Sequence, residues 1–377
     1  MNLRRLRAMA RKEAIHIRRD PRSLGLAIGI PMLMLILFGY ALTVDVDHVP
    51  LVVWDQSGTT QSREFVAQFT ASRYFDFRGA ASDYAGLVRA IDERTALLAL
   101  VIPPDFAGRL DAGRPAEVAA IIDGSDANTA AIVLGYAQAV AGVFNQRVAL
   151  AQSLRATGRA AAPPLDLRPR VWFNEELESR NFIIPGLIAV IMGLIAALLT
   201  SLTVAREWEH GTMEQLISTP VKPAEVIVGK LIPYFVVGMV DVLIAVLMAV
   251  FLFHVPLRGS VTLLFATAAL FLVGTLAQGI LISVLARGQL LASQIAMVST
   301  FLPAFLLSGF MFAIVNMPVP VQVITYIVPA RYFVAIVKGI YLRGVGLTVL
   351  WPDVIFLAVF AALVLALAVT QLKKRLD

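Results

Sequence analysis

The sequence predicts a polytopic α-helical membrane protein with six transmembrane helices, cytoplasmic N- and C-termini, and an α/β periplasmic domain between helices 1 and 2. Hydrophobic residues make up 58% of the 377 residues and charged residues only 15%, against roughly 45–50% and 25% in ordinary globular chains. With a mean hydropathy of +0.78, this composition excludes a soluble enzyme and a disordered chain. The second observation is that long uncharged gaps separate the charged residues.

The uncharged gaps define the predicted spans, because a transmembrane helix needs about 20 mainly apolar residues. Gaps that each fit one helix lie at 23–44, 181–205, 231–257 (interrupted by Asp241 alone), 259–286 and 354–372. The first gap could also be a signal peptide. It is longer than the usual h-region of about 7–15 residues and no A-x-A cleavage site closes it, so we interpret it as a retained first helix.

The gap at 288–330 is too long for one span, since one helix of that length would be about twice as long as the hydrocarbon layer is thick. Prolines that remove helical hydrogen-bond donors interrupt it at Pro303, Pro318, Pro320 and Pro329. We therefore expect a span near 290–312, followed by re-entrant outer half-helices at 313–345. Two full spans are the alternative interpretation.

Basic residues orient the chain, because short cytoplasmic loops are enriched in Lys and Arg. With six spans, one side carries the many basic residues of 1–22 together with Arg206, Lys222, Lys230, Arg287, Lys373, Lys374 and Arg375. Short segments on the other side carry only Arg258, Arg331, Lys338 and Arg343. The more basic side is predicted to be cytoplasmic, which places 45–180 in the periplasm and 181–377 in helices 2–6.

The two extramembrane segments differ in character. Residues 1–22 interleave apolar and basic side chains, which predicts a cytoplasmic amphipathic helix at the membrane surface, beside anionic lipid. Residues 45–180 alternate short apolar strands with helices, which is typical of an α/β domain. The predicted strands are 51–54, 97–102 and 118–122, the predicted helices are 63–70 and 128–154, and 158–164 reads as a linker.

Motifs for catalysis and for cofactor binding are absent from the sequence. It has no G-x-x-x-x-G-K-[ST] phosphate loop, no H-E-x-x-H and no G-x-S-x-G. It has no cysteine, and its four histidines are too far apart to form a ligand-spaced pair. We therefore expect no enzyme activity, no metal site and no cofactor in this chain.

The segment 206–220 directly follows the second predicted span. Gly211 is predicted to end the helix that leaves the membrane. Thr212 and Gln215 then match a capping box that would begin a short second helix, which Pro220 ends. Several acidic residues and a tryptophan favour a docking surface over a plain solvated loop.

This segment resembles the coupling helix of ABC-2-type transporter permeases. Other segments resemble that family in the same order over essentially the whole chain: Lys-Glu at 12–13, Arg-Arg-Asp-Pro-Arg at 18–22, Phe-Gly-Tyr at 38–40, Asp-Gly-Ser at 123–125 with Asn-Thr at 128–129, Phe-Ile-Ile-Pro-Gly at 182–186, Leu-Ser-Gly-Phe at 307–310 and Val-Pro-Ala-Arg-Tyr-Phe at 328–333. The chain is most similar to the paired inner-membrane permeases of multidrug ABC exporters of Gram-negative bacteria.

The resemblance implies a multi-pass permease of the bacterial inner membrane that exports drugs or other hydrophobic small molecules. It implies a separate ATPase subunit that binds ATP and Mg, a second permease (identical or related), a periplasmic adaptor of the membrane-fusion type, contact with lipid, and no nucleic acid. The residues expected to couple to the ATPase are Glu207, Trp208, Glu209, Gly211, Thr212, Glu214 and Leu216. An outer gate is expected from Phe305, Leu307, Phe310 and Phe312.

Asp241 is the one carboxylate inside a predicted span, near its middle. Intramembrane ionisable residues are costly and are functional candidates by default, although a buried, protonated or paired Asp that fixes helix packing is the plainer interpretation. Gln278, Gln294 and Ser293 are candidate partners. Asp241 also keeps open a proton-coupled secondary transporter, and the periplasmic domain keeps open a non-transporting scaffold or receptor.

Overall fold

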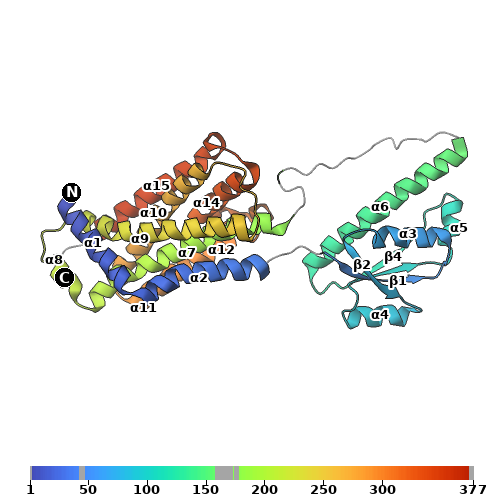
Figure 1. The fold of residues 1–377 in the computed structure, drawn as a ribbon, viewed down its shortest axis with the longest axis horizontal. Coiled ribbons are helices and arrows are strands. Elements are labelled where there is room, and N and C mark those ends of the chain that lie inside the picture. Colours follow the sequence, from blue (N-terminus) through green and yellow to red (C-terminus); the bar gives the residue numbers. More distant parts are fainter. Residues whose placement is uncertain (1, 42–46, 158–172, 174–177, 373–377) are drawn as a thin grey trace. The chain divides into compact units, whose positions relative to one another are not determined.

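The structure is a computed structural model that describes residues 2–41, 47–157, 173 and 178–372. The chain divides into two compact units, Met1–Thr43 with Val171–Asp377, and Val44–Arg170. The first unit is helical and the second combines helices with a sheet (Figure 1). The linker predicted at 158–164 lies outside the described residues.

The helical unit is built from long apolar helices and several short ones. Its α-helices are α1 (Leu3–Arg19), α2 (Pro21–Ala41), α7 (Ser179–Glu209), α8 (Thr212–Ile217), α9 (Pro223–Leu247), α10 (Val261–Ala286), α11 (Gln289–Ala296), α12 (Leu302–Leu307), α13 (Val319–Thr325), α14 (Pro329–Lys338) and α15 (Leu347–Gln371). Short π-helical segments continue three of these helices: η1 (Met248–Leu252), η2 (Met297–Phe301) and η4 (Gly339–Arg343). A 3-10 turn, η3 (Ile314–Asn316), precedes α13.

Five helices of the described chain are long and apolar enough to cross a membrane. They are α7, α9 with η1, α10, the run from α11 to α12, and α15. A sixth is counted if α13 and the Pro329–Arg343 segment, which meet at 83°, form one span. The apolar part of α2, Ala27–Ala41, is shorter, and residues 42–44 of the predicted first span lie outside the described residues. The described chain therefore has five or six candidate transmembrane helices.

The helix predicted near 290–312 ends earlier than expected, at Leu307. Ser308 follows it, and Gly309 then has φ +78°, a left-handed conformation that glycine adopts without steric cost. The chain turns there and enters η3 and α13, so the bend is set by glycine rather than by the prolines alone.

Helix α7 forms the centre of the helical unit. Of its most apolar stretch, 78% is buried, against 22% for α9 and for α15. Helix α10 crosses it at Gly279, where a Cβ would lie 2.1 Å from Thr200 Oγ1 and 2.3 Å from the carbonyl oxygen of Ala197. One turn further along α10, Ser283 Oγ accepts the backbone N–H of Val204 at 3.0 Å. The two helices are therefore joined by close backbone approach and by a hydrogen bond.

The second unit is an α/β structure around a four-stranded sheet. Its strands are β1 (Val49–Asp55), β2 (Phe75–Ala80), β3 (Leu98–Ile102) and β4 (Ala119–Ile122), in the order β2-β1-β3-β4. Strand β1 runs parallel to β2 and β3, whereas β4 pairs antiparallel with β3. The helices are α3 (Thr60–Thr70), α4 (Tyr84–Asp92), α5 (Phe106–Asp111) and α6 (Ala127–Thr157).

Three strands and two helices of this unit lie where the sequence places them. Helix α3 begins earlier than residue 63, because Thr59 and Ser62 form a capping box. Strand β2 and helices α4 and α5 were not predicted. In β2, Asp76 and Arg78 alternate with apolar residues, and their side chains form an ion pair on the surface. A short strand with two charges gives no apolar run to detect.

Candidate functional site

A sharp joint connects α7 to α8. Helix α7 ends at Glu209, and Gly211 has φ +68°, which fits glycine after a helix C-terminus. The predicted end of the helix at Gly211 is confirmed. The predicted capping box is wrong, because Gly211 is the N-cap of α8 and has no side-chain cap. The Thr212 hydroxyl instead donates back to the carbonyl oxygen of Glu207 at 3.3 Å, so it stabilises the joint from the α7 side.

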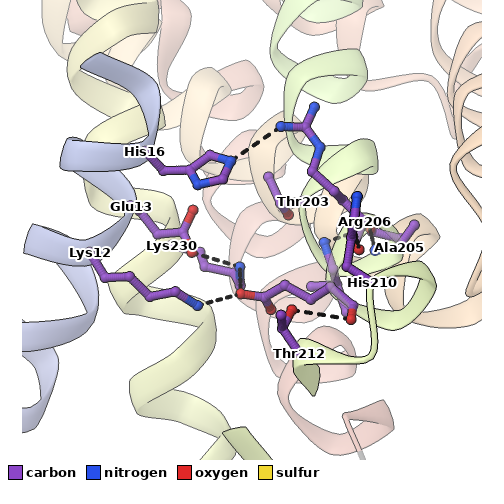
Figure 2. Close-up of polar contacts among 12 residues, drawn as sticks. Lys12, Glu13, His16, Thr203, Ala205, Arg206, His210, Thr212 and Lys230 are labelled. Carbon is purple, nitrogen blue, oxygen red and sulfur yellow. Dashed lines mark hydrogen bonds and ion pairs between the residues drawn. The ribbon is translucent and has the colours of Figure 1, made fainter. Parts of the chain in front are cut away.

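A buried ion cluster lies behind this joint. Lys230 of α9 places its Nζ 2.8 Å from Glu13 Oε1 of α1 and 3.0 Å from Glu207 Oε1 of α7. Lys12 Nζ lies 2.7 Å from the same Glu207 oxygen. Figure 2 shows Lys12, Glu13 and Lys230 converging from α1 and α9. Two cations and two carboxylates from three helices thus form a neutral cluster.

Burial makes this cluster sensitive to change. The side chains of Lys230 and Glu13 are 1% and 6% exposed, whereas Lys12 is 50% exposed. Removing one partner of a buried ion pair costs about 3–5 kcal/mol, because the other charge remains buried and unpaired. Glu207 Oε2 has no hydrogen-bond partner among the described residues, so Glu207 relies on the two lysines that reach its other oxygen.

Backbone groups also tie α1 to the start of α9. The Asn2 N–H donates to Glu225 Oε1 at 2.5 Å, and Glu225 Oε2 accepts the Lys222 N–H at 2.9 Å. The Arg5 guanidinium donates to the carbonyl oxygen of Pro220, in the loop between α8 and α9. Together with the Lys12–Glu207 ion pair, these contacts attach α1 to both ends of the segment that holds α8.

Two predicted coupling residues connect the joint to α11. Glu209 Oε1 accepts the backbone N–H of Gln289 at 2.7 Å, and the Gln289 amide donates to Glu209 Oε2. Arg287 lies over the Trp208 ring, with Cζ 5.2 Å from the ring centre. These contacts hold the end of α7 against Arg287 at the end of α10 and against Gln289 at the beginning of α11.

The seven predicted coupling residues therefore differ in how far they are buried. Glu207, Trp208 and Glu209 make internal contacts, and Leu216 is half-buried against the core. On α8, Met213 is buried, while Glu214 and Gln215 are exposed. The face that α8 offers to a partner is consequently smaller than the sequence indicated.

The residues predicted for an outer gate are only partly together. Phe305 and Phe310 make an edge-to-face contact at 5.7 Å between ring centres, and Leu307 is half-buried. Phe310 is 2% exposed, but Phe312 is 55% exposed and stands apart. Lys338 of α14, which the sequence did not single out, donates to the carbonyl oxygen of Gly309 at 2.9 Å. This bond fastens the turn after α12.

Asp241 is not paired with the partners suggested from the sequence. Its side chain is buried, and its Oδ1 has no hydrogen-bond partner in the described parts of the chain. Gln278 donates to Thr300 Oγ1 at 3.4 Å, Gln294 is exposed, and Ser293 donates to the carbonyl oxygen of Leu290. Asp241 therefore does not fix helix packing through a hydrogen bond with any of these three residues.

Sequence reasoning missed Glu13 and Lys230 as site residues. A signal for Glu13 was present, because Leu6, Met9 and Glu13 follow one another at intervals of three and four residues and so share one helix face. An acidic residue on the apolar side of an amphipathic helix points to a buried partner. Lys230 gave no such signal, since the cytoplasmic end of a span is an ordinary place for lysine.

Together these features define a polytopic membrane protein in which a short exposed helix is fastened to several long apolar helices. The model of the ABC-2 family transporter proteins matches residues 21–370, and the chain belongs to this family. It is 38% identical to the "Probable multidrug ABC transporter permease YbhS" of Escherichia coli, over 100% of this chain and 99% of that protein. It is 30% identical to the permease YbhR, over 95% of each chain. The "Inner membrane transport permease YhhJ" is 28% identical over 91% of this chain and 92% of that protein.

The chain is thus an ABC-transporter permease with several apolar membrane helices. The sequence-based resemblance to ABC-2-type permeases, and to multidrug permeases in particular, is confirmed by these matches.

Proposed function

We propose that this permease forms the transport pathway of an ATP-driven exporter, and that α8 transmits the movement of a separate ATPase subunit. The single observation that supports this most is the mounting of α8. Its joint at Gly211 is fastened by Glu207 to α1 and α9, and by Glu209 to α11. A push on α8 would therefore reach four helices at once.

The proposed topology follows the bias of the basic residues. The chain crosses the inner membrane six times, with both termini, α1 and α8 in the cytoplasm and the α/β unit in the periplasm. The bent pair α13 and α14 is then a re-entrant element near the outer face, where Phe305, Leu307 and Phe310 contribute to a gate. Phe312, which is exposed, would contact lipid or a partner.

The proposed partners follow from the class of transporter. The ATPase subunit binds ATP and Mg, a second permease completes the pathway, and a periplasmic adaptor meets the α/β unit. Two relatives carry multidrug permease in their names, which supports hydrophobic small molecules or drugs as the substrates.

Charge reversal on α8 tests the proposal. Glu214 is exposed, so Glu214→Lys should weaken copurification of the ATPase and reduce substrate-stimulated ATP hydrolysis and export. Leu216→Asp should have a larger effect, part of which comes from lost packing, because Leu216 is half-buried. The matched control is Glu117→Lys, an exposed glutamate before β4, which should leave all three measurements unchanged. If both Glu214→Lys and Leu216→Asp kept wild-type copurification, ATP hydrolysis and export, α8 would not be the coupling element.

The energy source is tested in inverted vesicles. Export should require ATP and should persist when the proton gradient is collapsed by an uncoupler. Export that continues without ATP and stops with the uncoupler would instead support a proton-driven secondary transporter.

A further inference from the structure

Arg206 is a half-buried cation without an anionic partner among the described residues. It is the first charged residue after the uncharged part of α7. Its guanidinium donates to Gln289 Oε1 and to His16 Nε2, each at 3.4 Å, which is long for a hydrogen bond. No ion pair joins it to a described carboxylate. A guanidinium has five N–H groups, so Arg206 keeps donors for a further acceptor.

The cavity beside Arg206 carries a net positive charge. It measures about 510 Å³ and is lined by the ion cluster, by Arg206 and by residues of α8. The two lysines and two glutamates of the cluster neutralise one another, and with neutral histidines Arg206 supplies the remaining charge. Figure 2 shows its guanidinium directed to His16, away from Lys12 and Lys230. An anion in this cavity would therefore meet Arg206 rather than the cluster.

A second cavity, the apolar slot, adjoins the first and measures about 60 Å³. The two cavities share His16, Arg206 and Tyr234. The apolar wall of the slot comes from α1, α2, α7 and α9, namely Ile17, Leu24, Ala27, Leu199, Leu202 and Val237. All of these except Ala27 are half-buried, so the slot is open to the outside of the bundle. Asp20 also lines the slot and is engaged in another interaction.

The two cavities lie at the level where headgroups and acyl chains meet in a membrane. The large cavity is surrounded by charged residues of α1, α7 and α9, whereas the slot follows the uncharged parts of α2, α7 and α9. Arginine binds phosphate through two parallel hydrogen bonds, and basic pockets between transmembrane helices bind lipid headgroups. The slot has room for roughly four methylene-sized groups, since a water-sized group needs about 10–15 Å³.

We propose that these two cavities bind one phospholipid of the adjoining membrane leaflet. Its phosphodiester enters the large cavity and accepts two hydrogen bonds from the Arg206 guanidinium. The first methylenes of one acyl chain enter the apolar slot, and the rest of the chain lies in the surrounding membrane. The lipid thereby connects the turn between α1 and α2 to α7 and α9. The site is complete within the permease and does not rest on the proposed coupling to an ATPase.

Native mass spectrometry of the full-length permease, released from lipid nanodiscs with a mild detergent, tests the site. Nanodiscs of phosphatidylglycerol or of phosphatidylethanolamine offer the same phosphodiester with and without a net negative charge. Wild type should keep one phospholipid per chain from either membrane after the other lipids have dissociated. Arg206→Gln should lower this occupancy about tenfold or more, because hydrogen bonds to charged groups are the stronger ones. Arg206→Lys, which keeps the charge without the paired donors, should give an intermediate value.

Arg287→Gln is the matched control for the headgroup. Arg287 is also the first charged residue after an uncharged helix, α10, and it lines neither cavity. Leu202→Trp, which fills the slot, should lower the lipid occupancy with Arg206 in place. Its control is Leu198→Trp, because Leu198 is half-buried on the same helix and lines neither cavity.

Three results would overturn the proposal. Wild type could keep no lipid, or Arg206→Gln or Leu202→Trp could keep as much lipid as its control. Inorganic phosphate alone could displace the lipid, which would make the cavity a site for free phosphate in which the slot has no part. Copurification of the ATPase is measured separately on the same variants, so a failed lipid site leaves the test of α8 unaffected.

Discussion

Met9 of α1 lies directly against Gly229 of α9: a Cβ on Gly229 would be 2.5 Å from the Met9 Cβ. This close approach brings Glu13, one turn after Met9, within 2.8 Å of Lys230, the residue after Gly229. The glycine therefore determines whether the buried ion cluster can form.

Gly229→Ala should displace α1 from α9 and separate Glu13 from Lys230. Small-to-large changes in packed sites cost about 1–3 kcal/mol of stability. The weakened ion pair between Glu13 and Lys230 adds to this cost. We expect a lower thermal unfolding midpoint and faster proteolysis after the basic residues of α1. Gly25→Ala in α2 is the control, because nothing lies within 4 Å of a Cβ there. Equal unfolding midpoints for the two variants would contradict the close-contact argument.

Lys230→Met should destabilise the permease far more than Lys12→Met. Both lysines contact Glu207 Oε1, but Lys230 is buried and its loss leaves the buried Glu13 without its cation and Glu207 with Lys12 alone, at a cost of about 3–5 kcal/mol. Lys12 is half-exposed, and pairs of that kind contribute about 0–1 kcal/mol. Thermal unfolding of the two detergent-solubilised variants compares their stability. If Lys12→Met were the more damaging change, the cluster would depend on its exposed member.

Gly279→Ala should force α10 away from α7. The new Cβ would meet Thr200 Oγ1 and the Ala197 carbonyl, and a backbone group cannot rotate aside. We expect a loss of about 1–3 kcal/mol in the free energy of unfolding. Gly142→Ala in α6 has open space around the Cβ and should be neutral or stabilising by up to about 1 kcal/mol, since alanine favours helix over glycine. An unchanged free energy of unfolding in Gly279→Ala would show that α7 and α10 can move apart at their crossing without cost.

Reporter fusions test the proposed topology. Fusions at residue 110, in α5, should report periplasm, and fusions at residues 215 and 377 should report cytoplasm, because the basic residues favour that side. An alkaline phosphatase signal at 377 would require an odd number of spans and would make the bent pair α13–α14 a full crossing.

Local patterns in the sequence predicted the long helices well. The gap between Arg180 and Arg206 predicted α7, and that between Arg258 and Arg287 predicted α10, because helices that cross a membrane exclude charge over their whole length. The end of α7 at Glu209, two residues before Gly211, followed from glycine's tolerance of a positive φ. Strand β2 alternates apolar residues with Asp76 and Arg78, which also indicates a half-buried strand, but it lacks the continuous apolar run that marked the other three strands.

The site depends on contacts that no local pattern contains. Glu13, Glu207 and Lys230 come from three segments far apart in the chain, and each alone resembles an ordinary charged residue near a membrane surface. The sequence therefore indicated Glu207 as a surface charge, whereas it lies inside. Gln278, Gln294 and Ser293 were named as candidate partners of Asp241, but its Oδ1 has no hydrogen-bond partner among the described residues, because the register between helices is set by packing.

The π-helical segment Met297–Phe301 has a consequence for how this permease tolerates insertions and deletions. A π turn holds one residue more than an α turn, which rotates everything after it by about 100° around the helix axis. Phe305 follows that turn and meets Phe310. Deleting a single residue between 297 and 301 would restore a regular α-helix and leave Phe305 facing Phe310, because the loss of one residue cancels the loss of the π turn. Converting the π turn to a regular α turn without a deletion would instead turn Phe305 away by about 100°. The contact thus depends on the π turn and the length of this segment together.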